Sequence, residues 1–342
     1  MTQTQLPTPP SVDVIEIDNL ADIKPALLSS DTPWVARDVA KDWPLVVLGK
    51  SQPHQALDYL QKFYQGRPIS AFIAEPHIGG RFFYNDTLDG FNFTQVDTTL
   101  DRVLDKLRNL LQEPSPPALY VGSTNVDAWL PGLRAENDFP LQHLNPLVSL
   151  WLGNQSRVAP HFDFPRNLAC CVLGKRRFTL FPPEQVENLY VGPWDLTPAG
   201  QPISMVDTHN PDLARFPRFE TAWQAAQIAE LEPGDVLYMP GMWWHQVEAT
   251  DDINGLINYW WSETPGVMGS PVDAFNHALL SLKSLPPSQK RAWKKFFDHY
   301  IFAADPEEAV SHIPEQRRGR LGAIDDTQAR RLRAELTNRL KR

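Results

Sequence analysis

Hydrophobic residues in the first third of the chain follow helical spacing in some segments and strand spacing in others. Trp34–Arg37 and Ile69–Phe72 are short apolar runs that predict strands, and Ala56–Tyr64 has the spacing of a helix. A further helix is predicted over Val96–Leu111, where five apolar residues share one helical face: Leu100, Val103, Leu104, Leu107 and Leu111. These segments predict flanking α/β elements ahead of the main body.

From about residue 118 to 263 the apolar runs are short and rich in β-branched and aromatic residues. Ala118–Val121 is the first, and several more follow between 148 and 262, most of them separated by turn residues. This pattern predicts an all-β body with many short strands. The stretch Glu184–Glu230 contains prolines and little periodicity, and so long a connection inside a compact domain usually forms a lid or a substrate-binding wall.

Helical spacing returns after Pro271. Asp273–Leu282, Ser288–Ala303 and Asp325–Lys341 predict helices. The second of them carries more large apolar residues at helical spacing than one short helix needs for its own packing: Trp293, Phe296, Phe297, Tyr300 and Ile301. We therefore expect a homodimer through the C-terminal helices; packing of this helix on its own barrel is the alternative.

These changes of pattern set the expected domains. Residues 1–12, with Pro7, Pro9 and Pro10, predict a disordered tail, residues 13–270 a single catalytic domain, and residues 271–342 a C-terminal helical region. The start lacks the basic-then-apolar pattern of a secretory signal, and no window approaches the roughly 18 apolar residues of a membrane span. We expect a cytoplasmic protein without a membrane segment.

Composition narrows the function classes. With 42% hydrophobic residues the chain can bury a sizeable core, and a formal charge of −9 argues against a general nucleic-acid binder. The two cysteines, Cys170 and Cys171, are neighbours in an apolar run. On a strand their side chains would point to opposite faces, so we expect two core residues and no disulfide between them.

Candidate chemistry begins with His161-Phe162-Asp163. Residues i and i+2 of a strand share a face, so the imidazole and the carboxylate can point at one ion. Such a triplet alone is weak, because a chain with nine histidines contains one roughly once by chance. A surface strand with alternating polar residues would look the same.

A later segment supplies a third ligand. Pro233-Gly234-Asp235 predicts a turn, Val236–Met239 a strand, and Pro240-Gly241 a break, after which His245 opens the next strand. Together, His161, Asp163 and His245 would form a face of two histidines and one carboxylate. That face leaves positions open for substrate and O2, as in non-haem Fe(II) oxygenases. We predict that these three residues bind Fe(II) and form the catalytic centre; Zn(II) or Ni(II) can occupy such a site after purification.

Several stretches over residues 118–263 also carry a family resemblance. They are Ala159-Pro-His-Phe-Asp163, Phe178-Thr-Leu-Phe-Pro-Pro183, Asn210-Pro-Asp-Leu-Ala-Arg-Phe-Pro217, the Pro-Gly-Asp turn with Trp-Trp-His245, and Asn258-Tyr-Trp260. The chain resembles the JmjC/cupin-like Fe(II)/2-oxoglutarate-dependent oxygenases, and is most similar to the asparaginyl hydroxylase called factor inhibiting HIF and its bacterial cupin-like relatives. The resemblance implies a mainly β, double-stranded β-helix (jelly-roll) fold, ferrous iron, and 2-oxoglutarate and O2 as co-substrates.

The resemblance further implies which residues hold the co-substrate. Tyr120 and Asn167 are expected to hydrogen-bond 2-oxoglutarate, and Asn258 to line the same pocket. The family's basic anchor is a lysine two residues beyond a glycine, and that position, counted from Gly174, is Arg176. Val158 is a departure, because it stands where the hydroxylase has a threonine hydroxyl that touches the co-substrate.

Strand alternation separates Arg176 from the cations on either side of it. It places Arg176 on one face of the strand and Lys175 and Arg177 on the other. Either Arg176 or its two neighbours can therefore face the interior of the barrel, but not all three. An arginine can hold a carboxylate through two hydrogen bonds. We predict that Arg176 anchors 2-oxoglutarate and that Lys175 and Arg177 are solvated.

The expected activity is hydroxylation, or demethylation by way of hydroxylation, of an unidentified substrate. A peptide or protein side chain is the first hypothesis, by family analogy alone. A small molecule or a modified nucleoside is the alternative, and only the basic segment 312–342 favours RNA. A non-catalytic cupin-like module that binds a ligand or partner is a third hypothesis, against which the intact triad argues.

Overall fold

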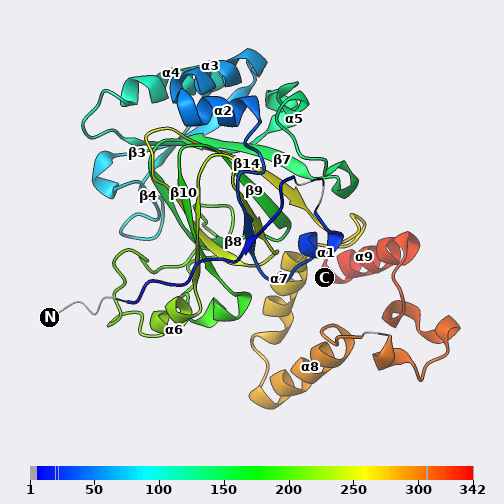
Figure 1. The fold of residues 1–342 in the computed structure, drawn as a ribbon. Coiled ribbons are helices and arrows are strands. Elements are labelled where there is room, and N and C mark those ends of the chain that lie inside the picture. Colours follow the sequence, from blue (N-terminus) through cyan, green and yellow to red (C-terminus); the bar gives the residue numbers. More distant parts are fainter. Residues whose placement is uncertain (1–5, 20, 22, 306, 342) are drawn as a thin grey trace. The chain divides into compact units, whose positions relative to one another are not determined.

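The computed structural model describes residues 6–19, 21, 23–305 and 307–341 (Figure 1). The chain divides into two compact units, Met1–Ser262 and Glu263–Arg342. The predicted catalytic domain extended to residue 270, whereas the structural division comes directly after Ser262. Among the described residues, no helix is both long enough and apolar enough to span a bilayer.

Two sheets form the body of the first unit. Across the described residues, the larger sheet has nine strands, in the order β1 (Val14–Ile15), β2 (Trp34–Ala36), β12 (Val236–Met239), β9 (Arg166–Leu173), β14 (Asn254–Trp261), β7 (Leu147–Gly153), β6 (Ala118–Asn125), β3 (Pro68–Ala74) and β5 (Thr94–Thr99). The smaller has five, in the order β11 (Gln227–Leu231), β10 (Arg176–Phe181), β13 (Trp244–Ala249), β8 (Ser156–Phe162) and β4 (Arg81–Phe82). From β7 to β14 the chain passes back and forth between the two sheets, which confirms the predicted jelly roll.

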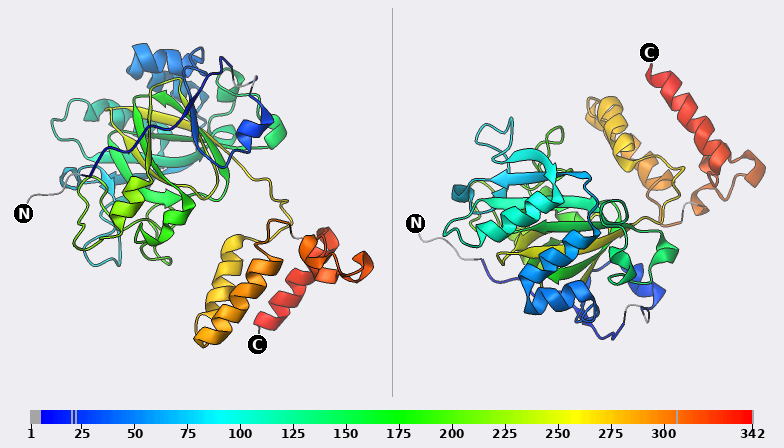
Figure 2. Two further views of the ribbon diagram at one scale, coloured as in Figure 1. Left: turned by 60° about the horizontal axis from the view of Figure 1, so that its bottom comes forward. Right: turned by 90° about the horizontal axis from the view of Figure 1, so that it is seen from above.

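Three N-terminal helices pack together beside the larger sheet: α2 (Pro44–Ser51), α3 (Pro53–Phe63) and α4 (Leu100–Leu110) (Figures 1 and 2). Their apolar faces, which include Leu45, Leu57 and Leu104, are fully buried in one core with the sheet. Shorter helices are α1 (Pro25–Leu28), α5 (Val126–Trp129) and α6 (Phe219–Gln224). These elements match the predicted α/β flank of the barrel.

The predicted helix over Val96–Leu111 is wrong in its first turn. Val96 and Thr98 lie in β5, where they pair with Ala71 and Ile69 of β3, and the helix begins only at Leu100. The β-branched residues before Leu100 favour an extended backbone, and the free edge of β3 offers them hydrogen-bond partners that an isolated helical turn lacks.

The sheet separates two hydrophobic cores. Cys170 packs in the core shared with the helices, and Cys171 packs inside the barrel with Phe178 and Leu237. Both thiols are free and buried, and they occupy opposite faces of β9 as alternation predicted. The barrel interior therefore receives every second residue of β9, including Asn167.

The described part of the predicted tail contacts the barrel. The amide of Val12 donates to Ile228 O (2.8 Å), the amide of Ile228 donates to Pro10 O (2.9 Å), and the indole of Trp223 donates to Pro7 O (2.6 Å). The prediction of disorder is therefore wrong for residues 7–12, because an extended, proline-containing segment can pair with the edge of β11. Its first five residues lie outside the described residues.

The second unit contains α7 (Pro271–Leu282), α8 (Pro287–Tyr300) and α9 (Asp326–Leu340). Each agrees with a helix predicted from apolar spacing to within a few residues. Ser270 and Asp325 cap α7 and α9 through their side chains, and a proline opens both α7 and α8.

Candidate active site

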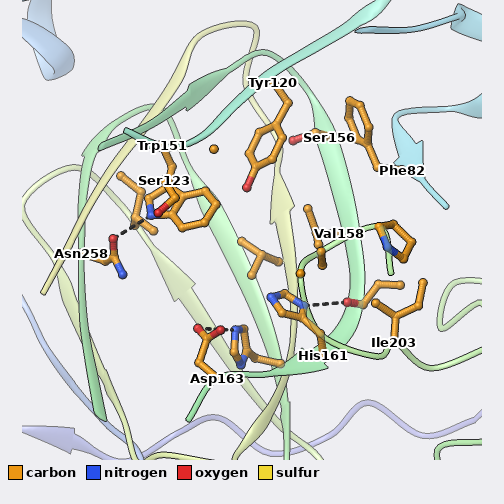
Figure 3. A pocket seen from close by; sticks show the side chains of 18 of the residues that line it. Phe82, Tyr120, Ser123, Trp151, Ser156, Val158, His161, Asp163, Ile203 and Asn258 are labelled. Carbon is orange, nitrogen blue, oxygen red and sulfur yellow. Dashed lines mark hydrogen bonds and ion pairs between the residues drawn. The ribbon is translucent and has the colours of Figure 1, made fainter. Parts of the chain in front are cut away.

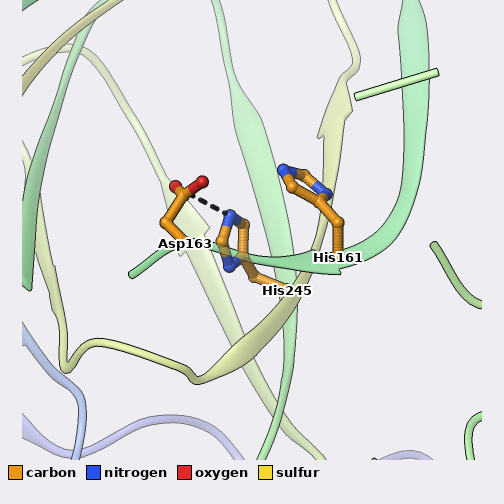
Figure 4. A group of neighbouring side chains, drawn as sticks. All are labelled: His161, Asp163 and His245. Carbon is orange, nitrogen blue, oxygen red and sulfur yellow. Dashed lines mark ion pairs between the residues drawn. The ribbon is translucent and has the colours of Figure 1, made fainter. Parts of the chain in front are cut away.

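Three potential metal ligands converge at one end of the barrel (Figure 4). His161 on β8 and His245 on β13 are cross-strand partners, with ring centroids 4.3 Å apart, and Asp163 follows directly after β8. One ligand atom from each side chain lies within 4.8 Å of the other two. The structure thus brings together the three residues that the sequence predicted.

Backbone carbonyls fix the direction of both imidazoles. Nδ1 of His161 lies 2.9 Å from Ala159 O, and Nδ1 of His245 lies 3.0 Å from Trp243 O. A carbonyl can only accept, so Nδ1 carries the proton and Nε2 keeps its lone pair, as a metal-binding histidine requires. Burial, aided by the charge of His245, lowers the pKa of His161 to about 4 and keeps its ring neutral at pH 7.

The turn before His245 is bonded to the backbone of Asp163, which brings that residue close to the second histidine. The amide of Met242 donates to Asp163 O (2.7 Å), and Nε2 of His245 lies 3.6 Å from Asp163 Oδ2. A Cβ at Gly241 would lie 2.4 Å from Phe164 O, so only glycine allows this close approach. The Pro-Gly break that the sequence showed is therefore part of how the site is positioned.

A cavity of about 360 Å³ extends from the triad into the barrel (Figure 3). Its lining includes every residue that the sequence proposed for metal or co-substrate: His161, Asp163, His245, Tyr120, Asn167, Arg176 and Asn258. Val158 also lines it, beside His161. The site residues predicted from separate strands therefore share one cavity.

Arg176 lies inside the barrel without a counter-ion. It is 5% exposed, and among the described residues it has no carboxylate partner, while its Nε also lacks a hydrogen-bond acceptor. Its neighbours face outward, where Lys175 pairs with Glu232 (2.6 Å) and Arg177 lies 3.9 Å from Glu230. Burial lowers the pKa of Arg176, yet an arginine stays charged in a protein, so the cavity has an unpaired cation.

Polar groups that line the cavity form a short chain across three strands. The indole of Trp151 donates to Asn258 Oδ1 (2.7 Å), and Nδ2 of Asn258 donates to Asn167 Oδ1 (3.4 Å). Burial raises the pKa of the Tyr120 phenol, which therefore stays protonated and can donate a hydrogen bond. Tyr120, Asn167 and Asn258 are the three residues, besides Arg176, that the family resemblance assigned to the co-substrate.

Sequence reasoning missed two further polar groups in this region. The indole Nε1 of Trp260 and the hydroxyl of Ser149 are buried and, within the described residues, have no hydrogen-bond partner. Trp260 lines the cavity, and Ser149 is the cross-strand partner of Asn258. Strand alternation could have found Trp260, because it is two residues from Asn258 on β14.

The part of the cavity lining that packs against Tyr120 is aromatic. Phe72 of β3, Phe82 of β4 and Phe93, which directly precedes β5, all line the cavity, and the sequence analysis did not single them out. The runs Arg-Phe-Phe-Tyr and Phe-Asn-Phe in this region were the available signal. The predicted wall segment Glu184–Glu230 contributes Pro198–Gly200 and Ile203 to the lining.

Comparison with known proteins agrees with this site. Residues 21–266 match the family described as Cupin-like domain. The chain is 36% identical to human HSPB1-associated protein 1 over 151 residues, which are 42% of this chain and 30% of that protein. It is 31% identical over 115 residues to Lysine-specific demethylase JMJ31 of Arabidopsis thaliana, covering 33% of this chain and 20% of that protein.

A longer match reaches JmjC domain-containing protein D of Dictyostelium discoideum. The identity is 24% over 249 residues, which cover 68% of this chain and 52% of that protein. The chain thus spans about half or less of the length of these relatives. The predicted JmjC/cupin family is confirmed, whereas the particular similarity to the asparaginyl hydroxylase stays a prediction.

Proposed function

We propose that this chain, which belongs to the cupin-like domain family, is an Fe(II)- and 2-oxoglutarate-dependent dioxygenase that hydroxylates its substrate. The observation that carries the proposal is the unpaired, buried guanidinium of Arg176 in the same cavity as the triad. A buried cation without a counter-ion is unfavourable, so this position favours an anionic ligand. A keto dicarboxylate is such a ligand, because one end can reach a metal and the other a guanidinium.

The donor set fits ferrous iron. His161, Asp163 and His245 offer two neutral imidazoles and one carboxylate on one side of an ion, which leaves positions for co-substrate and O2. Bound iron supplies the redox chemistry that couples O2 and 2-oxoglutarate to oxidation of a C–H bond. The protein residues supply the positions: backbone carbonyls hold both imidazoles, and Asp163 is tied to the turn before His245.

The remaining residues bind the co-substrate and limit water. Arg176 would hold the distal carboxylate, and Tyr120, Asn167 and Asn258 line the same cavity. Aromatic walls around the triad keep the site poor in water, which limits side reactions of a strong oxidant. A peptide or protein side chain is the substrate that we propose first. Because one relative is named a lysine-specific demethylase, removal of a methyl group by hydroxylation is the second candidate.

An anaerobic titration with Fe(II) and 2-oxoglutarate tests the assignment. We expect the weak visible absorption band of the iron–2-oxoglutarate chelate, which a non-catalytic binding module would not produce. His245→Ala removes one of three protein ligands and should abolish tight Fe(II) binding and 2-oxoglutarate-dependent O2 consumption. His143→Ala, at an exposed histidine outside the cavity, is the matched control and should change neither. Full metal affinity in His245→Ala would disprove the triad.

A further inference from the structure

We infer that the substrate group that enters this cavity is uncharged and apolar, and that it is neither a methylammonium nor a guanidinium group. The inference rests on the proposed function for the role of the triad and of Arg176. It concerns the part of the cavity between the metal ligands and the wall that contains Phe72, Phe82 and Phe93.

Few of the side chains that line the cavity are ionisable. Among the described lining residues, the ionisable side chains are the triad, Arg176 and the protonated Tyr120. Asp163 is the only acid among them, and the proposed function uses it as a metal ligand. With the proposed ligands bound, Asp163 holds the metal and the distal carboxylate of the co-substrate pairs with Arg176. A cationic substrate would therefore find, among the described lining residues, no carboxylate side chain left to pair with it.

The substrate wall is built from uncharged groups. Phe82 is buried, Phe72 and Phe93 are partly exposed, and Ile203 adds to the apolar surface of the cavity. In Figure 3, Phe82, Val158 and Ile203 lie on the same side of the cavity as His161. Partly exposed aromatic rings in a cavity are apolar area that a ligand can remove from water, which favours an aliphatic or aromatic substrate group.

Aromatic rings can also attract a cation through their faces, so this alternative has to be weighed. Here the rings cover part of those faces by contacts with one another. Phe93 is stacked on Phe91 (4.9 Å, 4°), and Phe72 meets Phe93 edge-on (5.6 Å, 90°). What remains for a cation is the weak attraction of phenylalanine, which does not offset the loss of hydration of an ion without a counter-ion.

Two probes of the same shape separate these possibilities. The neutral 3,3-dimethylbutan-1-ol and the cation choline differ mainly in a carbon atom that replaces the charged nitrogen. Their dissociation constants are measured by ligand-observed NMR on the full metal-free chain, so the result does not depend on iron or turnover. We expect the alcohol to bind at least about tenfold more tightly than choline.

A pair of variants at Phe93 tests whether the preference for the neutral probe arises in this cavity. Phe93→Glu adds a carboxylate to the substrate wall, and Phe93→Gln adds a side chain of the same shape as glutamate but without the charge. The affinity for choline relative to the alcohol should be at least about threefold higher in Phe93→Glu than in Phe93→Gln. Choline binding as tightly as the alcohol to the natural chain, or equal ratios in the two variants, would overturn the inference. Failure of the iron titration would overturn the proposed function alone.

Discussion

Three adjacent cations in the hairpin after Gly174 differ in their surroundings. Lys175 and Arg177 face glutamates on β11 and the turn that follows it, and their side chains are 59% and 38% exposed. Arg176 lies between them in sequence, inside the barrel, and no described residue pairs an anion with it. Chemically similar residues are thus separated by the two-residue period of a strand, and only the inner one can contact a co-substrate.

This arrangement gives a prediction with built-in controls. Arg176→Ala removes the cation available to the distal carboxylate, and the loss of a buried charge-assisted contact costs on the order of 2–5 kcal/mol. Binding of 2-oxoglutarate, followed by calorimetry on the metal-loaded chain, should weaken by roughly 30-fold or more. Lys175→Ala and Arg177→Ala should each change it by less than about threefold. Normal 2-oxoglutarate binding in Arg176→Ala, together with weakened binding in Lys175→Ala or Arg177→Ala, would show that the other face of β10 lines the barrel.

Side-chain alternation explains which site residues could be predicted at this scale. The triad followed from residue type and period, because His161 and Asp163 are two residues apart and His245 opens a strand. Phe72, Phe82 and Phe93 could not be found in this way. Their place in the lining depends on β3, β4 and β5 joining the edges of the two sheets, and strand alternation does not reveal such long-range pairing.

Among the elements, β5 shows where local pattern fails. The leucines of α4 dominate the helical face, and the pattern was extended backward through Val96 to Thr99. Pairing with β3 decided the conformation of these four residues, in agreement with their β-branched side chains. The helix end was predicted closely, because its apolar spacing continues to Leu110 and Leu111.

The Pro-Gly-Asp turn is a second element whose role becomes clear only in three dimensions. Gly234 has φ +103°, which favours glycine, and the carboxylate of Asp235 is almost fully buried. It accepts from Arg37 (2.7 Å) and from the amides of Asp38 and Glu232 (3.0 Å each). This stretch, which resembles a family signature, therefore connects β12 to the residues that follow β2.

We predict that Asp235→Ala destabilises the protein by about 2–4 kcal/mol. The change leaves two backbone amides without their acceptor and removes one of the two acceptors of Arg37, which keeps Glu230 O. Urea unfolding followed by tryptophan fluorescence measures the change. Asp252→Ala is the control: its carboxylate accepts an exposed hydrogen bond from Gln155 (3.2 Å), and its loss should cost less than about 0.5 kcal/mol. Equal stability of the two variants would show that the turn needs no buried acceptor.

For the whole molecule, the sequence predicted the order of its parts: an α/β flank, a jelly roll and C-terminal helices. This prediction rested on periodicity, because the apolar residues of each part keep one spacing over many residues. The residues at the borders were harder to predict. Residues 7–12 pair with β11 and the segment before it, and the first unit closes at Ser262, because tertiary contacts and not local composition decide these positions.

The C-terminal unit leads to the last prediction, a homodimer through α8. Trp293, Phe296 and Ile301 are 47%, 57% and 61% exposed, and the rings of Trp293 and Phe296 are in contact (5.6 Å). A cluster of large apolar side chains on one helix favours burial against a second copy of the chain. Light scattering of the full chain should therefore give the mass of a dimer.

Two glutamate substitutions on the same helix test where the dimer forms. Phe296→Glu places a charge within the apolar cluster and should shift the protein to monomer at micromolar concentration, because an unpaired buried charge is unfavourable in an interface. Lys294→Glu alters a side chain that is 74% exposed and pairs with Asp298, so the dimer should persist. A monomeric natural chain, or a dimer that survives Phe296→Glu as well as Lys294→Glu, would mean that α8 is not the contact.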